Sequence, residues 1–209
     1  MATRLTRDDR KARTREELVA TARRVFLHRG FHRASLDEIA AEAGYTKGAV
    51  YSNFASKDEL FLAVMDDHYG RRVDAYAGFL FDQPTAEEAY RAVARFMVEG
   101  DERDPGWTPL LSEFMVHASR HEALRRQVVE SRERFLDAIA GLIERLCAKH
   151  DVEFRLPAKE IARGSGAIAR GLFVERLMSP GSVSPELFEE VHVAYMRGLA
   201  VPTHERSTR

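Results

Sequence analysis

The stretch from residue 46 to residue 53 collects side chains that suit contact with a nucleic acid. It begins with a hydroxyl and an ammonium group at the start of a predicted helix, where free backbone N–H groups can also meet a phosphate or a base edge. Glycine and alanine follow, which allow close approach, and a methyl group can pack on thymine. The candidate contact residues are Thr46, Lys47, Gly48, Ala49, Tyr51, Ser52 and Asn53. Ser35 and Lys57 stand at the predicted starts of the flanking helices, where phosphates are often clamped.

Residues 36–54 supply a scaffold for this stretch, in the form of two short helices joined by a tight turn. A steep crossing of two helices needs small residues, which Ala40 and Ala43 provide, while Gly44 permits a left-handed turn conformation. Larger side chains are placed to pack the two helices on each other and on a preceding helix: Ile39, Tyr45, Val50 and Phe54. The pattern predicts a helix-turn-helix, whose second helix enters the major groove of DNA.

Apolar residues recur at helical spacing in nearly every segment, without a convincing strand pattern, so the sequence predicts an all-α fold. Ser35 and Glu38 read as a reciprocal capping box at the start of the second helix, and a third helix runs from about 46 to 54. Ser56 caps a fourth helix, a strut that continues past Tyr76. Five further helices are centred near residues 93, 114, 134, 168 and 192.

The charge of the chain is divided along its length. Residues 1–58 hold 12 Lys and Arg against 8 Asp and Glu, a net charge of +4. Residues 59–209 hold 20 Lys and Arg against 25 Asp and Glu, a net charge of −5. A basic head suits a nucleic-acid partner, and an acidic remainder argues against a protein that packages DNA without sequence preference. We place a domain boundary here, with a three-helix DNA-binding domain at 1–58 and a larger helical domain at 59–209.

The single cysteine, Cys147, provides neither an intramolecular disulfide nor a zinc knuckle, which favours a reducing compartment. We read it as a small buried residue rather than a redox switch, because no second cysteine or cationic run is near. The charged N-terminus lacks the apolar core of a signal peptide, and no stretch reaches the roughly 18 apolar residues of a membrane span. We expect a cytoplasmic protein without a membrane partner.

Basic residues crowd the start of the chain, and acidic residues dilute them. Two interpretations fit equally well. The segment is either the solvent-exposed start of the first helix or an arm that lies in the minor groove of DNA. The basic residues concerned are Arg4, Arg7, Arg10, Lys11, Arg13 and Arg15.

Residues 13–64 resemble the N-terminal domain of the TetR family of bacterial transcriptional regulators. The residues that match are Phe26, Gly30 and Phe31 around the end of the first helix, Ile39, Ala40, Ala43 and Gly44 in the second, the run Lys47 to Phe54 in the third, and Lys57 with Leu60 at the fourth. The resemblance implies a homodimer that binds a double-stranded DNA operator. It also implies a small-molecule effector cavity among the strut and the following helices, and a dimer interface from the last two helices.

Such a cavity needs apolar side chains from the helices that follow the strut, although each candidate taken alone fits plain core at least as well. The predicted ligand-binding residues are Phe96, Met97, Trp107, Leu111, Phe114, Met115, His117 and Phe135.

Glu113, His117 and His121 fall four apart, a spacing that places metal ligands on one face of a helix. Ser119 and Glu122, however, read as a capping box that starts a new helix and removes His121 from that face. We therefore expect neither a metal nor another cofactor, and we assign His117 to the cavity.

Near residue 168, two glycines on one side of a predicted helix allow another helix to approach closely, and the last helix offers a matching apolar stripe. The predicted dimer interface comprises Ile168, Gly171, Leu172, Glu175, Val191 and Tyr195. Burial within one protomer would leave the same pattern.

These features predict a ligand-responsive, DNA-binding transcriptional regulator, a repressor that a small apolar or amphipathic effector releases from a palindromic operator. A transcriptional activator is the alternative. A helical-bundle enzyme or carrier is the rival from another class. Because the sequence has no G-x-S-x-G, no Gly-rich phosphate loop and no H-E-x-x-H, we expect no enzymatic activity.

Overall fold

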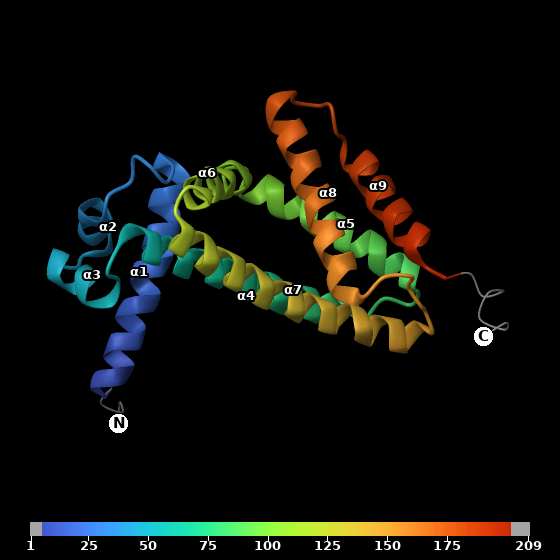
Figure 1. Ribbon diagram of the computed structural model, residues 1–209, viewed down its shortest axis with the longest axis horizontal. Coiled ribbons are helices and arrows are strands. Elements are labelled where there is room, and N and C mark those ends of the chain that lie inside the picture. Colours follow the sequence, from blue (N-terminus) through green and yellow to red (C-terminus); the bar gives the residue numbers. More distant parts are fainter. Residues whose placement is uncertain (1–5, 202–209) are drawn as a thin grey trace. The chain divides into compact units, whose positions relative to one another are not determined.

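The computed structural model describes residues 6–201, and every regular element in that range is a helix (Figure 1). In chain order the helices are α1 (Arg7–Arg29), α2 (Leu36–Ala43), α3 (Lys47–Asn53), α4 (Lys57–Leu80), α5 (Ala86–Arg103), α6 (Trp107–Ser119), α7 (Glu122–His150), α8 (Ala158–Met178) and α9 (Pro185–Leu199). The predicted all-α fold is confirmed, including the strut, which is α4. None of the helices within 6–201 is long and apolar enough to span a bilayer.

The helices group into two compact units. The head unit comprises residues 6–69 and 110–131, and the body unit comprises residues 70–109 and 132–201. Three helices, α4, α6 and α7, contribute residues to both units. The predicted domain boundary at residue 58 divides the chain by function and stays a prediction.

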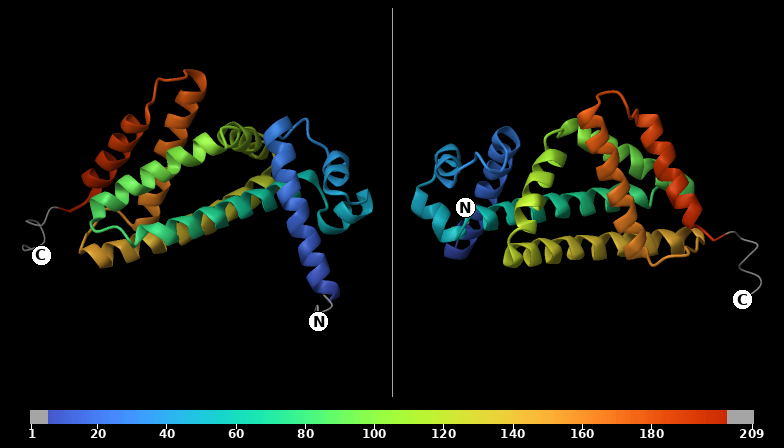
Figure 2. Two further views of the ribbon diagram at one scale, coloured as in Figure 1. Left: turned by 180° about the vertical axis from the view of Figure 1, so that it is seen from behind. Right: turned by 45° about the horizontal axis from the view of Figure 1, so that its top comes forward.

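In the head unit, local signals set the ends of the first three helices, which lie together in both views of Figure 2. Thr6 and Asp9 form a capping box at the start of α1. Gly30 follows α1 with a φ of 79°, and Gly44 ends α2 in the left-handed conformation with a φ of 73°. Both positions favour glycine because a side chain is strained at such φ values.

The capping boxes that the sequence suggested at two other helix starts are wrong in part. The Ser35 hydroxyl does accept the Glu38 N–H at 3.1 Å, but the Glu38 carboxylate pairs with Arg29 at 2.8 Å instead of returning to Ser35. Ser119 ends α6 and donates to the Val116 carbonyl, so it does not cap α7. In the first case a side chain of α1 takes the carboxylate, and in the second the Ser119 hydroxyl bonds to a backbone carbonyl of its own helix.

Four phenylalanines from four segments form the core of the head unit. Their ring centroids lie 4.1 Å apart for Phe61 and Phe114, 4.9 Å for Phe31 and Phe114, and 5.1 Å for Phe26 and Phe61. All four side chains are at most 1% exposed. Tilted and edge-to-face contacts of this kind add about 0.5–1.5 kcal/mol per pair beyond the burial of apolar area. The start of α4 and the middle of α6 are thereby fixed to α1 and to the loop after it.

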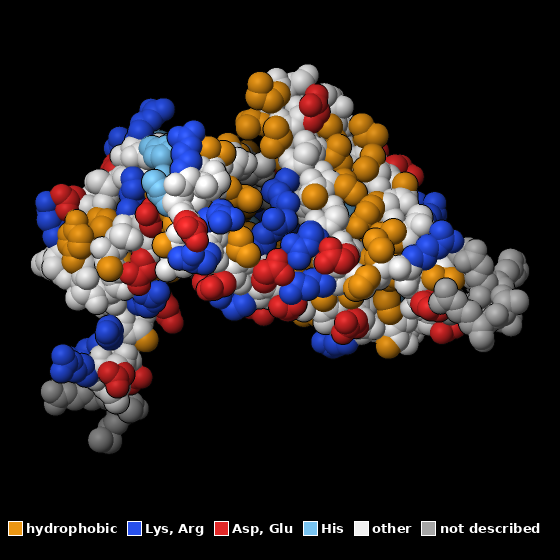
Figure 3. Space-filling model, in the orientation of Figure 1, with side chains coloured by type: hydrophobic (Ala, Val, Ile, Leu, Met, Phe, Trp, Pro, Cys, Tyr) orange, Lys and Arg blue, Asp and Glu red, His pale blue; other side chains and the backbone are white. Residues whose placement is uncertain are grey.

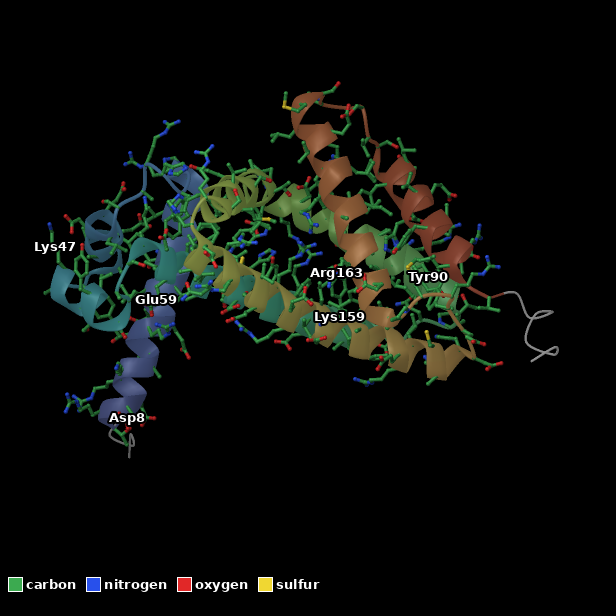
Figure 4. The ribbon with its side chains drawn as sticks, in the orientation of Figure 1. Asp8, Lys47, Glu59, Tyr90, Lys159 and Arg163 are labelled. Atoms are coloured by element: carbon green, nitrogen blue, oxygen red, sulfur yellow. The ribbon has the colours of Figure 1, made fainter. Side chains whose placement is uncertain are left out.

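In the body unit, ion pairs join neighbouring helices around an apolar core. Arg91 on α5 pairs with Glu189 on α9 at 2.8 Å. From α8, Lys159 and Arg163 (Figure 4) both reach the carboxylate of Glu133 on α7, each at 3.0 Å. These charges are partly exposed, so each pair contributes little to stability, and the apolar core carries most of it.

Candidate nucleic-acid interface

The face of α3 that points away from the head core carries most of the predicted contact residues. Val50 anchors the opposite face and is fully buried, whereas Tyr51 is 56% exposed. Thr46, Lys47, Gly48, Tyr51 and Ser52 are exposed, and Ala49 and Asn53 are half-buried. The Thr46 hydroxyl caps the helix by accepting the Ala49 N–H at 3.2 Å. The helix therefore presents a polar, cationic surface at its N-terminal end, where the helix dipole also favours a phosphate.

Two contacts from α1 hold this helix-turn-helix in place. The Tyr45 hydroxyl, in the turn, donates to Glu17 at 2.5 Å. Arg15 donates to the backbone carbonyl of Asn53 at 3.0 Å, and its guanidinium stacks 4.2 Å from the ring centroid of Phe54. Sequence reasoning missed these roles of Glu17 and Arg15, because contacts over 28 and 38 residues leave no periodic signature. Arg15 and the basic residues from Arg7 onward lie within α1, and Arg4 lies outside the described residues.

The Lys47 ammonium, at the outer edge of the head unit (Figure 4), pairs with the carboxylate of Asp37 on α2. The hydrogen bond from Lys47 to Asp37 raises the pKa of Lys47. Both side chains are more than half exposed. Lys47 is therefore an accessible ammonium whose partner in this structure is a carboxylate.

Two other predicted contact residues bond to their own helix in this structure. The Asn53 amide donates to the Ala49 carbonyl at 2.8 Å, and the Ser52 hydroxyl donates to the same oxygen at 2.9 Å. The Asn53 Oδ1 atom is buried and has no hydrogen-bond partner among the described residues. A contact between Asn53 and a base would require its amide to leave the Ala49 carbonyl.

Lys57 lies at the first position of α4, and its ammonium is directed into the loop between α1 and α2. It donates to the carbonyls of Phe31, His32 and Ala34 at 2.9, 3.1 and 3.1 Å, and it lies 4.6 Å from the Phe31 ring centroid. Burial lowers the pKa of Lys57. All three donors of the ammonium are used, so a contact with phosphate would require one of these bonds to break.

The residues predicted to line a cavity are divided between the two units. Phe96, Met97, Trp107 and Phe135 belong to the body unit, where the Phe96 ring lies 5.0 Å from that of Tyr76. Leu111, Phe114, Met115 and His117 belong to the head unit. Phe114 is part of the phenylalanine core, and His117 lies 3.1 Å from Asp58 on α4. The list stays a prediction for effector contacts.

Glu113, His117 and His121, whose spacing resembles that of metal ligands, do not lie along one face of a single helix. His121 leaves α6, as expected, yet its ring stays 4.8 Å from that of His117. Histidine side chains consequently group on the surface of the head unit (Figure 3). No group of three metal-ligating side chains within residues 6–201 is arranged to hold an ion.

The predicted dimer residues lie on α8 and α9 in the body unit. Gly171 and Glu175 are exposed, whereas Ile168, Leu172, Val191 and Tyr195 are half-buried. Tyr195 packs within the protomer, where its hydroxyl donates to the Ile161 carbonyl at 3.2 Å. Three neighbouring apolar side chains are exposed and were not singled out from the sequence, namely Val174, Leu177 and Met178. Leu187, which belongs to the apolar stripe predicted on the last helix, is exposed as well.

Two short helices, α2 and α3, joined by a tight turn and held by contacts from α1, with a polar exposed face on α3, define the helix-turn-helix class of DNA-binding proteins. Residues 18–64 match the family described as bacterial regulatory proteins, tetR family, and residues 86–201 match the BetI-type transcriptional repressor C-terminal family. The chain belongs to the TetR family of bacterial transcriptional regulators.

Individual relatives support this assignment. The transcriptional activator FasR of Mycolicibacterium smegmatis is 34% identical over 142 residues, which cover 68% of this chain and 62% of that protein. The transcriptional regulator BetI of Rhizobium meliloti is 26% identical over 172 residues, or 82% of each chain.

Solved structures show the same fold at low sequence identity. A TetR-family regulator from Mesorhizobium loti superposes with a TM-score of 0.71 at 22% identity, over 93% of this chain and 96% of that one. The regulator FadR of Bacillus subtilis, in complex with stearoyl-CoA, superposes with a TM-score of 0.69 at 14% identity, over 88% of this chain and 98% of that one.

Proposed function

We propose that the protein is a homodimeric repressor that binds a palindromic operator through α3 and leaves it when a small apolar or amphipathic effector binds the body unit. The observation that carries the proposal is the outward face of α3. Its charged and hydrogen-bonding side chains are accessible, while Val50 and Phe54 fix its other face to the head core. A short helix held in this way can enter the major groove without refolding.

The direct DNA contacts in this proposal fall into two kinds. Lys47 and the N-terminal end of α3 meet a phosphate, which contributes affinity at any sequence. Tyr51, Ser52 and the methyl of Ala49 meet base edges, which contributes specificity. In the dimer the two α3 helices contact half-sites about 34 Å apart, one turn of DNA.

Support for the dimer comes from the C-terminal end of α8, where apolar side chains gather on the surface (Figure 3). Leu177 and Met178 are 52% and 77% exposed, and Leu187 on α9 is 46% exposed. A Cβ atom added at Gly171 would meet nothing within 4 Å, so this face is open to a partner helix. Burying such a patch between two copies removes apolar area from water.

Support for an effector of this chemistry comes from the aromatic side chains of the body unit. Tyr76, Phe79 and Phe96 pack with ring centroids 5.0 to 6.0 Å apart, and the Arg72 guanidinium lies 5.5 Å from the Phe96 centroid. An aromatic cluster of this kind with a guanidinium beside it, if it opened to a ligand, would suit an apolar body with a polar or charged end. FadR of the same fold was solved with stearoyl-CoA, which is an amphipathic molecule.

Activation is the second candidate mode, because the M. smegmatis relative is named an activator. The position of the operator relative to the promoter distinguishes the two modes. An operator that overlaps the polymerase site supports repression, and one upstream of it supports activation.

The test is selection of bound fragments from genomic DNA, followed by gel shift of the enriched site with wild type and Tyr51→Ala. The matched control is Arg126→Ala, an exposed residue on α7 whose partner is Glu122. We expect one enriched palindrome, bound by wild type and the control and at least tenfold more weakly by Tyr51→Ala. Equal competition by random DNA at fixed salt would overturn the proposal of a specific operator.

A further inference from the structure

The carboxylate of Glu113, on α6, caps the loop that joins α1 to α2. One oxygen accepts the backbone N–H of Phe31 and the other accepts that of His32, both at 3.0 Å. The Glu113 side chain is about one third exposed, and the His32 imidazole lies 3.9 Å from it. The loop follows Gly30 directly, and an added Cβ atom at Gly30 would come within 3.1 Å of the same carboxylate. The backbone therefore approaches Glu113 closely over three consecutive residues.

The same loop is held by the opposite charge through its other polar atoms. Lys57 takes the carbonyls of Phe31, His32 and Ala34, while Glu113 takes the N–H groups of the first two. Charge-assisted bonds of this type are about twice as strong as neutral ones. Two ionised side chains, from α4 and α6, thus fix both faces of these peptide units.

This loop sets where the helix-turn-helix begins. Ser35, the residue that caps α2, follows Ala34 directly, and α2 carries α3 through the turn at Gly44. Glu113 lies about 80 residues further along the chain, on a helix outside the DNA-binding motif. A displacement of α6 that stretches its two bonds by more than half an ångström would break them and release the loop.

We propose, as an extension of the proposed function, that Glu113 is a positioning residue for operator binding. It touches no DNA, and it holds the α1–α2 loop in the conformation that presents α3. Operator affinity therefore depends on a carboxylate of α6, and any ligand that shifts α6 acts on the operator through these two hydrogen bonds.

The direction in which one substitution changes DNA affinity distinguishes this proposal from an effect of net charge alone. Removing a negative charge from a DNA-binding head should strengthen DNA binding if only the net charge matters. Glu113→Gln keeps the size of the side chain but lowers its strength as an acceptor, so positioning requires weaker binding. Glu130→Gln on α7 removes a charge from an exposed position of the head unit and is the matched control.

The experiment measures operator affinity for wild type, Glu113→Gln, Glu113→Ala and Glu130→Gln at one salt concentration, using the site selected with wild type. We expect roughly threefold weaker binding for Glu113→Gln and roughly tenfold for Glu113→Ala. The control should match wild type or bind slightly more tightly. Unchanged or tighter binding by both Glu113 variants would overturn the proposal, whereas failure of wild type to select a site would overturn the proposed function instead.

Amide hydrogen exchange without DNA gives a second readout that does not depend on the operator. Exchange at the Phe31 and His32 amides should accelerate at least tenfold in Glu113→Ala. The Gly30 amide, which donates to the Phe26 carbonyl at 2.8 Å, is the internal control and should keep its rate. Acceleration over the whole head unit would indicate general destabilisation and overturn a specific positioning role, as would unchanged rates at residues 31 and 32.

Discussion

Lys47 on α3 and Asp37 on α2 form an ion pair on the exposed side of the helix-turn-helix. A lysine ammonium is charged throughout the physiological pH range, and the hydrogen bond to Asp37 raises the pKa of Lys47 further. The carboxylate nevertheless competes with any phosphate for the same donor. In the proposed complex, Lys47 would exchange the Asp37 carboxylate for a phosphate, and the Asp37 charge would oppose that exchange.

Asp37→Asn should strengthen operator binding by roughly threefold at about 0.1 M salt, because the amide competes less well than a carboxylate for Lys47. Lys47→Ala should weaken binding and make the slope of log affinity against log salt shallower by about 1, since one phosphate is then no longer neutralised. Titration over a range of salt concentrations measures both effects. Glu122→Gln, which breaks an exposed pair with Arg126 on α7, should leave them unchanged. Weaker binding by Asp37→Asn would show that the pair orders Lys47 for DNA.

Gly30 and Gly44 both have positive φ, but alanine should cost more at Gly30. At Gly30, with a φ of 79° and a ψ of 164°, the backbone is nearly glycine-specific, and the added Cβ lies 3.1 Å from Glu113. At Gly44 the conformation is left-handed helical, and the added Cβ meets nothing within 4 Å. We expect losses of about 2 and about 1 kcal/mol of unfolding free energy, respectively. Urea unfolding checks the order, which equal losses would contradict.

His192 on α9 should make the stability of the protein sensitive to acid. Burial lowers its pKa to about 4, and its Nε2 lies 3.0 Å from the Ser165 hydroxyl. The unfolded chain takes up this proton near pH 6.5. The stabilising contribution of neutral His192 is therefore complete above pH 6.5 and is lost as the pH falls towards 4.

The measurement is the free energy of unfolding at several pH values for wild type and His192→Gln, each referred to its own value at pH 8. Wild type should lose up to about 1.4 kcal/mol per pH unit more than the variant between pH 6 and pH 4.5. Subtracting the variant's profile from that of wild type removes the contribution of carboxylates that titrate in both proteins. Parallel profiles would mean that His192 is protonated equally easily in the folded and unfolded states.

Leu177→Glu should dissociate the dimer that we propose, because it places a charge in the exposed apolar end of α8. We expect the dissociation constant to rise by at least a hundredfold, as measured by analytical ultracentrifugation. Val129→Glu alters an equally exposed valine on α7 in the head unit and should leave the oligomeric state unchanged. A dimer that survives Leu177→Glu would place the interface elsewhere.

The sequence predicted most of the elements because the signals that define them are local. The glycine that permits a left-handed turn after α2 and the apolar Val50 lie within seven residues of each other, and α3 (Lys47–Asn53) falls within the predicted range of about 46 to 54. The helices of the body unit also lie near their predicted centres. Periodic apolar patterns and capping residues need no knowledge of distant segments.

The contacts that hold the site could not be predicted in the same way. Glu113 accepts the Phe31 and His32 amides, and Lys57 donates to three backbone carbonyls. In each bond one partner is a backbone group, which every residue has, so the sequence does not indicate where the partner lies. A lysine at a helix start has the same sequence pattern whether it binds a phosphate or three loop carbonyls, so the sequence indicated only the first role, which stays a prediction. The second role becomes visible only when α4 packs beside the loop.

The length of α3 limits how much information one protomer can read. Its seven residues span about 10 Å, which corresponds to about three base pairs. Two copies can thus specify about six base pairs, one combination in about 4,000, while a genome offers roughly a million or more competing positions. Base contacts by α3 alone would leave hundreds of equally good sites. In the proposed complex the remaining discrimination would come from contacts outside α3 and from the shape and deformability of the DNA that α3 does not touch.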